Sequence, residues 1–127
     1  MDKNKIELIS DFVSANQNTS FKWGVFDCCV AISKVIEIQT ELDLYEPYRV
    51  TYKTEKGSLQ ALKKVGSIES ALDKHFNQIN PNFMQRGDVA MMEDGIMAFR
   101  IGNVLVATTE CGLKPVNTNV KIAWRVE

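Results

Sequence analysis

Two short dipeptides most strongly constrain what this chain can fold into. Asp94-Gly95 and Gly102-Asn103 each stand between runs of apolar and β-branched residues, and such pairs favour the tight turns of two-residue β-hairpins. They divide the C-terminal third into predicted strands, which are residues 89–92, 96–101, 104–108 and 120–126. Because strands joined by tight hairpins run antiparallel, the pattern predicts an antiparallel β-meander.

The residues before this region carry helical spacing. Ile6, Ile9 and Val13 recur at intervals of three and four, which predicts a helix over residues 3–16. Residues 28–39 predict a second helix, although many of them are β-branched and individually disfavour helix. Since only a narrow face of this segment is polar, we expect burial to override that preference and to place the helix at the centre of the core.

The middle of the chain has weaker patterns. Residues 41–56 lack a clean period and predict a short helix or turn followed by irregular chain. An amphipathic stretch opens at Gly57-Ser58 and ends at Gly66, a residue typical of helix C-termini. Ser67 then suits the N-cap of a short helix that runs through residue 75 or 76.

Helices followed by strands predict a single α+β domain over residues 1–127, with N-terminal helices packed on a C-terminal antiparallel sheet. Hydrophobic residues make up 45% of the chain and charged residues 24%, as in ordinary globular proteins. A chain of 127 residues buries roughly two-thirds of its unfolded surface, so it can hold a core without metals or disulfides.

Charge and hydropathy argue against several classes of function. Lys and Arg total 15 and Asp and Glu total 16, whereas nucleic-acid binders usually carry a basic excess or stripe. No apolar stretch is as long as a membrane span. The N-terminal pattern contains Glu7 and Asp11 and lacks the apolar centre of a signal peptide. We expect a protein made and kept in a cytoplasm, or exported only as part of something larger.

The three cysteines are Cys28, Cys29 and Cys111. Their odd number and the adjacent pair make a poor disulfide framework, so we expect reduced thiols. The chain has one histidine and no Cys-x-x-Cys motif, which argues against a zinc site. We therefore expect neither a metal nor a cofactor.

Cys28 is the candidate nucleophile, because it follows a suitable N-cap, Asp27, at the start of a predicted helix. A helix N-terminus favours the thiolate and lowers the pKa of a cysteine. A thiol hydrolase also needs a base, usually histidine, within hydrogen-bond reach, and His75 is the only candidate. Either its helix faces Cys28, or His75 is an ordinary packed or semi-exposed helix residue. The negative charge of Asp27 opposes formation of the Cys28 thiolate unless the carboxylate accepts hydrogen bonds from backbone N–H groups.

A resemblance extends this motif. Phe21-Lys22-Trp23-Gly24 leading into Asp27-Cys28-Cys29 resembles a family of small phage and prophage proteins that carries a domain-of-unknown-function label. That family is similar to the NlpC/P60 papain-like cysteine peptidases. The match runs from about Phe21 to Val126 and includes Arg49, Tyr52, Thr54, Gly57, Leu62, Gly66, Arg86-Gly87-Asp88-Val89, Cys111-Gly112-Leu113 and Ala123-Trp124-Arg125-Val126.

The resemblance implies an NlpC/P60-type layout. Asp27-Cys28 matches the pair that opens the central helix, and Gly87-Asp88-Val89 matches the strand that follows. The next strand begins with the catalytic histidine in those enzymes, and Ile96 stands at that position here. A polar residue that orients the histidine falls near Thr108. Phe26 also departs from the family, in which a polar residue, often histidine, precedes the Asp-Cys pair.

The resemblance and its departures imply a structural or assembly protein of a phage tail tip or baseplate, with a degenerate cysteine-peptidase fold. Such a protein is made in the host cytoplasm, resides in the virion tail and binds other tail proteins. Without a base, Cys28 loses an effect worth about 10²–10⁴-fold in rate. Two alternatives stay open. One is an active thiol amidase or endopeptidase acting on peptidoglycan, in which His75 or a partner residue reaches Cys28. The other is a phage-encoded inhibitor of a host system.

Overall fold

A computed structural model of the chain describes residues 3–22, 26–44, 54, 56, 67–117 and 119–127. The segment 41–56, in which a short helix or turn is predicted, lies mostly outside this part of the chain, and the amphipathic stretch at 57–66 lies wholly outside it. Within the described part, the helices are α1 (Lys3–Ala15), α2 (Cys28–Thr40), α4 (Ile68–His75) and the short 3-10 helix η2 (Pro81–Phe83).

One antiparallel sheet holds all the named strands in the order β1-β6-β2-β3-β4-β5. The predicted α+β class is confirmed. The simple meander needs a correction, because β6 crosses back to lie between β1 and β2 instead of extending the far edge. The strands are β1 (Asn77–Ile79), β2 (Val89–Met92), β3 (Met97–Ile101), β4 (Val104–Thr109), β5 (Gly112–Val116) and β6 (Val120–Arg125).

Both predicted turns lie between strands, but they differ in length. Gly102-Asn103 is a two-residue connection between β3 and β4. Asp94-Gly95 belongs to a longer turn, because the Met92 N–H donates to the Ile96 carbonyl at 2.9 Å and so encloses three residues. Gly95 takes a φ of 86° there, a conformation that costs glycine little.

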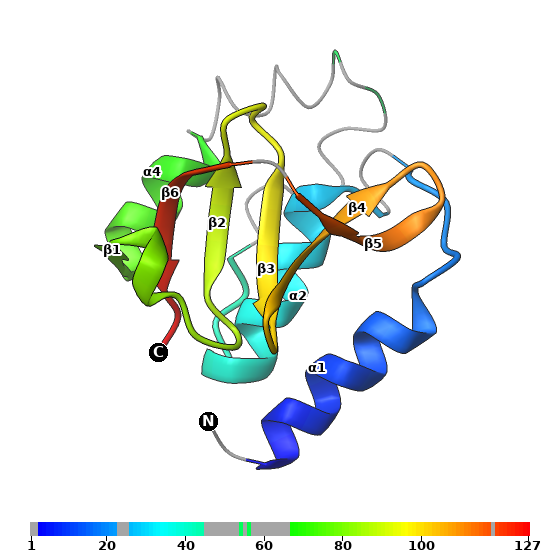
Figure 1. Cartoon of the computed structure of the whole chain (residues 1–127), viewed down its shortest axis with the longest axis horizontal. Helices are drawn as coiled ribbons and strands as arrows, with labels where there is room; N and C mark the ends of the chain where they lie inside the picture. Colours follow the sequence, from blue (N-terminus) through cyan, green and yellow to red (C-terminus); the bar gives the residue numbers. More distant parts are fainter. Residues whose placement is uncertain (1–2, 23–25, 45–53, 55, 57–66, 118) are drawn as a thin grey trace.

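The central helix α2 packs against β3, β4 and α1, and Figure 1 shows it behind β3. Ile32, Val35 and Ile36 are completely buried. Burial of such side chains stabilises a fold by about 1.5–3 kcal/mol each, which exceeds the few tenths that β-branched residues lose in a helix. The predicted buried helix is therefore confirmed.

The face of the sheet opposite α2 carries a row of alanines across four neighbouring strands. Register pairs Ala90 with both Ala123 and Ala98, and Ala98 with Ala107. All four are buried, in a second apolar cluster with Met84 and Met92. Because the four alanines are buried, larger side chains at these positions would have to displace their neighbours.

No helix in the described ranges combines the length and the apolar character that crossing a membrane requires.

Candidate functional site

The candidate thiol site begins at the N-terminus of α2. Asp27 has an extended backbone, and its Oδ1 accepts the Val30 N–H at 3.0 Å, as an N-cap does. Its side chain is buried, with 1% of the residue exposed. Cys28 is the first helical residue and is half-buried. The local sequence therefore positions this thiol through one capping interaction.

Cys29 and the backbone of Met97 both interact with the Cys28 sulfur. A hydrogen bond from the Cys29 thiol lowers the pKa of Cys28, and the Met97 N–H adds to this effect. Burial and the negative charge of Asp27 oppose it without reversing it. The pKa of Cys29 is raised, first because its proton is held in the bond to Cys28 and then by burial. Of the two adjacent thiols, Cys28 is therefore the one that ionises.

Met97 opens β3, so the start of this strand lies against the start of α2. Ile96 comes directly before it, is 39% exposed and donates its N–H to Asp94 Oδ1 at 3.1 Å. An isoleucine side chain has no lone pair and cannot accept a proton. The residue that directly precedes the strand start against the thiol is therefore not a base.

Thr108 lies on the neighbouring strand at the same level. Ala98 pairs with Ala107, so the following residue, Thr108, stands opposite Met97. By strand alternation it faces the same side as Val106, which packs in the core with α2. Its Oγ1 is buried, and the described part of the chain gives it no hydrogen-bond partner. An unpaired buried hydroxyl costs about 1–3 kcal/mol of stability. Thr108 therefore places an unsatisfied polar group at the end of the sheet that lies against Cys28.

His75, the other candidate residue, lies elsewhere. It is the last residue of α4, is exposed and is separated from β1 only by Phe76. Strands β6 and β2 separate β1 from β3, which is three strand spacings or roughly 14 Å. The pair Asn77–Arg125 also lies at the opposite end of the strands from Met97. The fold does not bring His75 and Cys28 together.

The third cysteine, Cys111, is exposed in the turn between β4 and β5, and its N–H donates to Thr109 Oγ1 at 3.2 Å. The next residue, Gly112, has a φ of 115°. A Cβ at that position would collide with the backbone carbonyl of Gln17, so only glycine fits. Cys111-Gly112 thus belongs to the contact between this turn and the chain after α1.

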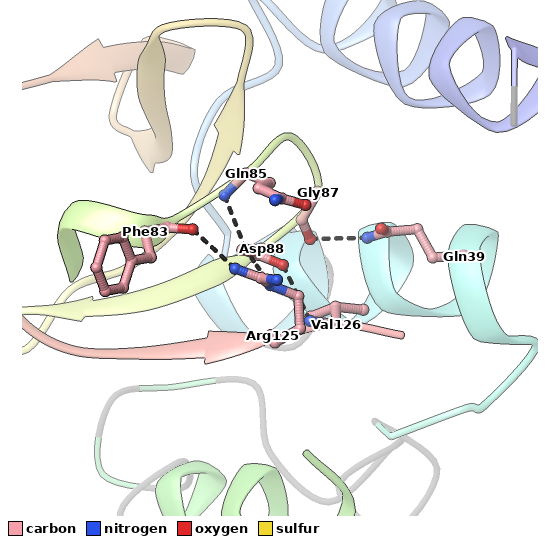
Figure 2. A network of polar contacts seen from close by, with 7 residues as sticks. All are labelled: Gln39, Phe83, Gln85, Gly87, Asp88, Arg125 and Val126. Atoms are coloured by element: carbon pink, nitrogen blue, oxygen red, sulfur yellow. Dashed lines mark hydrogen bonds and ion pairs between the residues drawn. The ribbon is translucent and has the colours of Figure 1, made fainter. Parts of the chain in front are cut away.

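The Gly87-Asp88-Val89 motif has a structural role that the sequence did not reveal. Figure 2 shows Asp88 at the centre of a polar network that joins the turn before β2 to the end of β6. Asp88 Oδ2 accepts the Gln85 N–H at 2.8 Å and Arg125 Nε at 3.0 Å, while Oδ1 accepts the Val126 N–H at 3.1 Å.

The same network reaches α2 and η2. Gln39 Nε2, near the end of α2, donates to the Gly87 carbonyl at 2.8 Å. Arg125 Nη2 donates to the Phe83 carbonyl at 2.7 Å. The Asp88 side chain is 2% exposed and its oxygens are filled by neighbours. This cluster therefore joins elements together and offers no vacant acceptor to a ligand.

In the described ranges, no group of three or more His, Cys, Asp or Glu residues could hold a metal ion. Within the thiol site, sequence reasoning missed the contact between Cys28 and Cys29. The adjacency of the two cysteines was its only signal. That signal is weak, because side chains one residue apart on a helix ordinarily do not face each other.

Comparison with known proteins identifies one family. A family model described as a domain of unknown function (DUF6950) matches residues 3–126, so the chain belongs to that family. No curated protein matches the chain. No solved structure matches it either.

Proposed function

We propose that this member of the DUF6950 family is a structural or assembly protein of a phage tail tip or baseplate, with a degenerate NlpC/P60-type cysteine-peptidase fold. The motif resemblance over residues 21–126 motivates the tail assignment. The arrangement around Cys28 motivates the degenerate site. In this proposal the fold is retained for the surfaces that it presents to other tail proteins.

The observation that carries the proposal is the identity of the residue that directly precedes the strand start lying against the thiol. The start of β3 lies against Cys28, which is where a papain-like enzyme holds its base. Ile96 occupies the position directly before that contact. Thr108, on the next strand, corresponds to the place of the residue that would orient a histidine. In this proposal, the position that would hold the base of a dyad is therefore occupied by a side chain that cannot take a proton.

His75 does not substitute for the missing base. It is exposed at the far edge of the sheet, and the nitrogen of a histidine base must lie within about 3.2 Å of the sulfur whose proton it removes, or reach it through one water. Amide hydrolysis by Cys28 in the isolated chain would then proceed without proton transfer to or from a histidine.

Association with tail proteins tests the proposal. The chain is purified with each of the tail-tip and baseplate proteins encoded beside its own gene, and complexes are detected by size-exclusion chromatography with light scattering. We expect a stable complex with at least one of them. The absence of any complex, under conditions in which the neighbouring proteins bind one another, would remove the main support for a tail role.

One observation favours a second candidate, an active thiol hydrolase of peptidoglycan. The pKa of Cys28 is lowered by the Cys29 thiol and the Met97 N–H, so part of the nucleophile's activation exists without a histidine. Digestion of purified cell walls, followed as release of soluble fragments, separates the two candidates. Digestion by the wild type that Cys28→Ala abolishes would favour the hydrolase, and no release at any pH would favour the structural role.

A further inference from the structure

Arginines gather at the end of the sheet opposite Cys28. Arg86 precedes β2, Arg100 lies near the end of β3 and Arg125 ends β6. These are three of the four arginines in the sequence. The strand ends that carry them are joined, since the Arg100 N–H donates to the Asp88 carbonyl at 2.9 Å and Arg125 pairs with the Asp88 carboxylate. In a chain with a net charge of −1, this is a marked local segregation of positive charge.

Two acidic residues, Asp88 and Glu127, line the grooves at this end. The Asp88 carboxylate is buried and paired with Arg125. Lys5 Nζ donates to the Gln39 carbonyl at 2.8 Å, a neutral acceptor. Arg86 is exposed and has no ion-pair or hydrogen-bond partner among the residues that the structure describes. Its guanidinium therefore faces solvent with its charge uncompensated.

Three adjoining grooves connect these charges with apolar surface. A polar groove of about 300 Å³ is lined by Lys5, Arg86 and Arg125. Arg86 also lines the next groove, of about 290 Å³, whose walls are mainly aliphatic. Val104, which is 44% exposed, joins that groove to a third of about 380 Å³. We call the surface that these grooves line the basic-apolar belt. It passes around the β3–β4 turn, because Arg100 and Ile101 face opposite sides of β3. Its main members are Lys5, Ile6, Arg86, Arg100, Ile101 and Val104.

We infer that the basic-apolar belt is a docking surface for an acidic, aliphatic segment of a partner protein, in which a carboxylate pairs with Arg86 and a branched side chain covers Val104. The inference deepens the proposed docking role and rests on it for the source of the partner. Charge complementarity indicates the carboxylate, and the aliphatic walls around Val104 indicate the apolar neighbour. Arginine is enriched in protein interfaces because it combines bidentate hydrogen bonding with an apolar stem.

A protein partner fits the belt better than a nucleic acid does. Proteins that bind single strands stack bases on aromatic side chains, and the described residues that line the three grooves include no aromatic residue. The centre of the belt is aliphatic, which matches the apolar core and charged rim of a protein interface. Binding of an oligonucleotide with the same dependence on Arg86 would contradict this choice.

Two substitutions and two matched controls test the belt. Arg86→Glu reverses an exposed charge that has no partner among the described residues, and Val104→Asp places a charge at the apolar centre of the belt. Lys121→Glu is the control for charge reversal, because Lys121 is exposed on β6 outside the grooves. Leu8→Asp is the control for the apolar change, because Leu8 is 45% exposed and lines none of the three grooves.

The probe is a short fluorescent peptide with alternating pairs of glutamate and leucine, and binding is measured by fluorescence anisotropy. We expect each belt variant to bind at least about tenfold more weakly than wild type, and each control to bind like wild type. A peptide with glutamine in place of glutamate should bind more weakly to the wild type. Equal binding by the belt variants and the wild type would overturn the inference, as would oligothymidine binding that Arg86→Glu abolishes.

The same four variants separate this inference from the proposed function. If tail proteins bind the wild type and both belt variants equally well, the belt is not the docking surface, although the tail role stands. If no tail protein binds while the peptide binds through Arg86 and Val104, the tail role fails and the belt remains a docking surface for another partner. Loss of tail-protein binding in the belt variants alone supports both.

Discussion

At the scale of single residues, the two adjacent cysteines have opposite roles. Cys28 accepts the Cys29 thiol hydrogen and lies against the Met97 N–H, so its pKa is lowered, whereas the pKa of Cys29 is raised. Asp27 opposes ionisation of Cys28, but its carboxylate also accepts the Val30 N–H. The thiol is therefore partly activated by its immediate neighbours, while Ile96 offers no proton acceptor.

Removing the Cys29 donor should raise the pKa of Cys28. In a Cys111→Ser background, Cys29→Ala should move the pH profile of Cys28 alkylation by iodoacetamide to higher pH and slow alkylation at neutral pH, by about tenfold for each unit of pKa. Cys29→Ser keeps a hydrogen-bond donor and should resemble the parent. Peptide mass spectrometry measures both. An unchanged profile in Cys29→Ala would show that the donor does not act on Cys28.

Asp73 provides a pH-dependent contact at the edge of the sheet. Hydrogen bonds from Gln78 at 2.7 Å and from Trp124 Nε1 at 2.9 Å lower the pKa of Asp73 below its ordinary value. The bond from Gln78 has the larger effect. A depressed folded-state pKa adds stability above the unfolded-state value, which is lost as the pH falls through the folded-state value.

Urea unfolding followed by tryptophan fluorescence should therefore show wild type more stable than Asp73→Asn at pH 6, with the difference shrinking below about pH 4. Asparagine is a suitable comparison because its carbonyl can still accept a hydrogen bond. A difference that stays constant with pH would mean that the charge of Asp73 is not what the two donors recognise.

At the scale of elements, some segments could be predicted from local sequence and others could not. Asp27 and Ser67 both cap helices as predicted, because capping depends on a few consecutive residues. Strand β1 was missed because Asn77-Gln78 is polar and its partner β6 lies more than forty residues away in the chain. Strand β5 was missed because it contains Pro115, which is tolerated here since β5 is an edge strand.

The Asp88 network joins elements that local patterns cannot connect. Asp88→Asn removes the charge that pairs with Arg125 and should lower the free energy of unfolding by about 3 kcal/mol, because breaking a largely buried ion pair leaves its partner uncompensated. Arg86→Gln, two residues away and without a partner in the described part of the chain, should cost less than about 0.5 kcal/mol. Chemical denaturation measures both. Equal stability of the two variants would contradict the structural role of Asp88.

The alanine row makes a second prediction at this scale. Ala98→Leu adds volume to a fully buried position between Ala90 and Ala107, and should destabilise the fold by about 1–3 kcal/mol through overpacking. Ala15→Leu, at the exposed end of α1, is the control and should change stability little. Thermal denaturation compares them. A neutral Ala98→Leu variant would show that the face opposite α2 has unfilled space.

At the scale of the whole molecule, the sheet separates two chemically different ends. One end carries Cys28, Ile96 and Thr108, and the other carries the Asp88 network and the basic-apolar belt. The α+β class and the thiol at the helix start could be predicted, because periodicity and capping are local. The separation of His75 from Cys28 could not, since it depends on β6 inserting between β1 and β2, a pairing that the strand pattern alone leaves open.

The central claim is that this fold is retained for binding and not for cleavage by Cys28. The most direct test is the yield of complex between Cys28→Ala and the tail-tip proteins encoded beside the gene, compared with the wild type under identical conditions. Because Cys28 is a half-buried thiol away from the basic-apolar belt, equal yields are predicted. A wild-type complex that disappears in Cys28→Ala, with the variant folded by circular dichroism, would contradict the account.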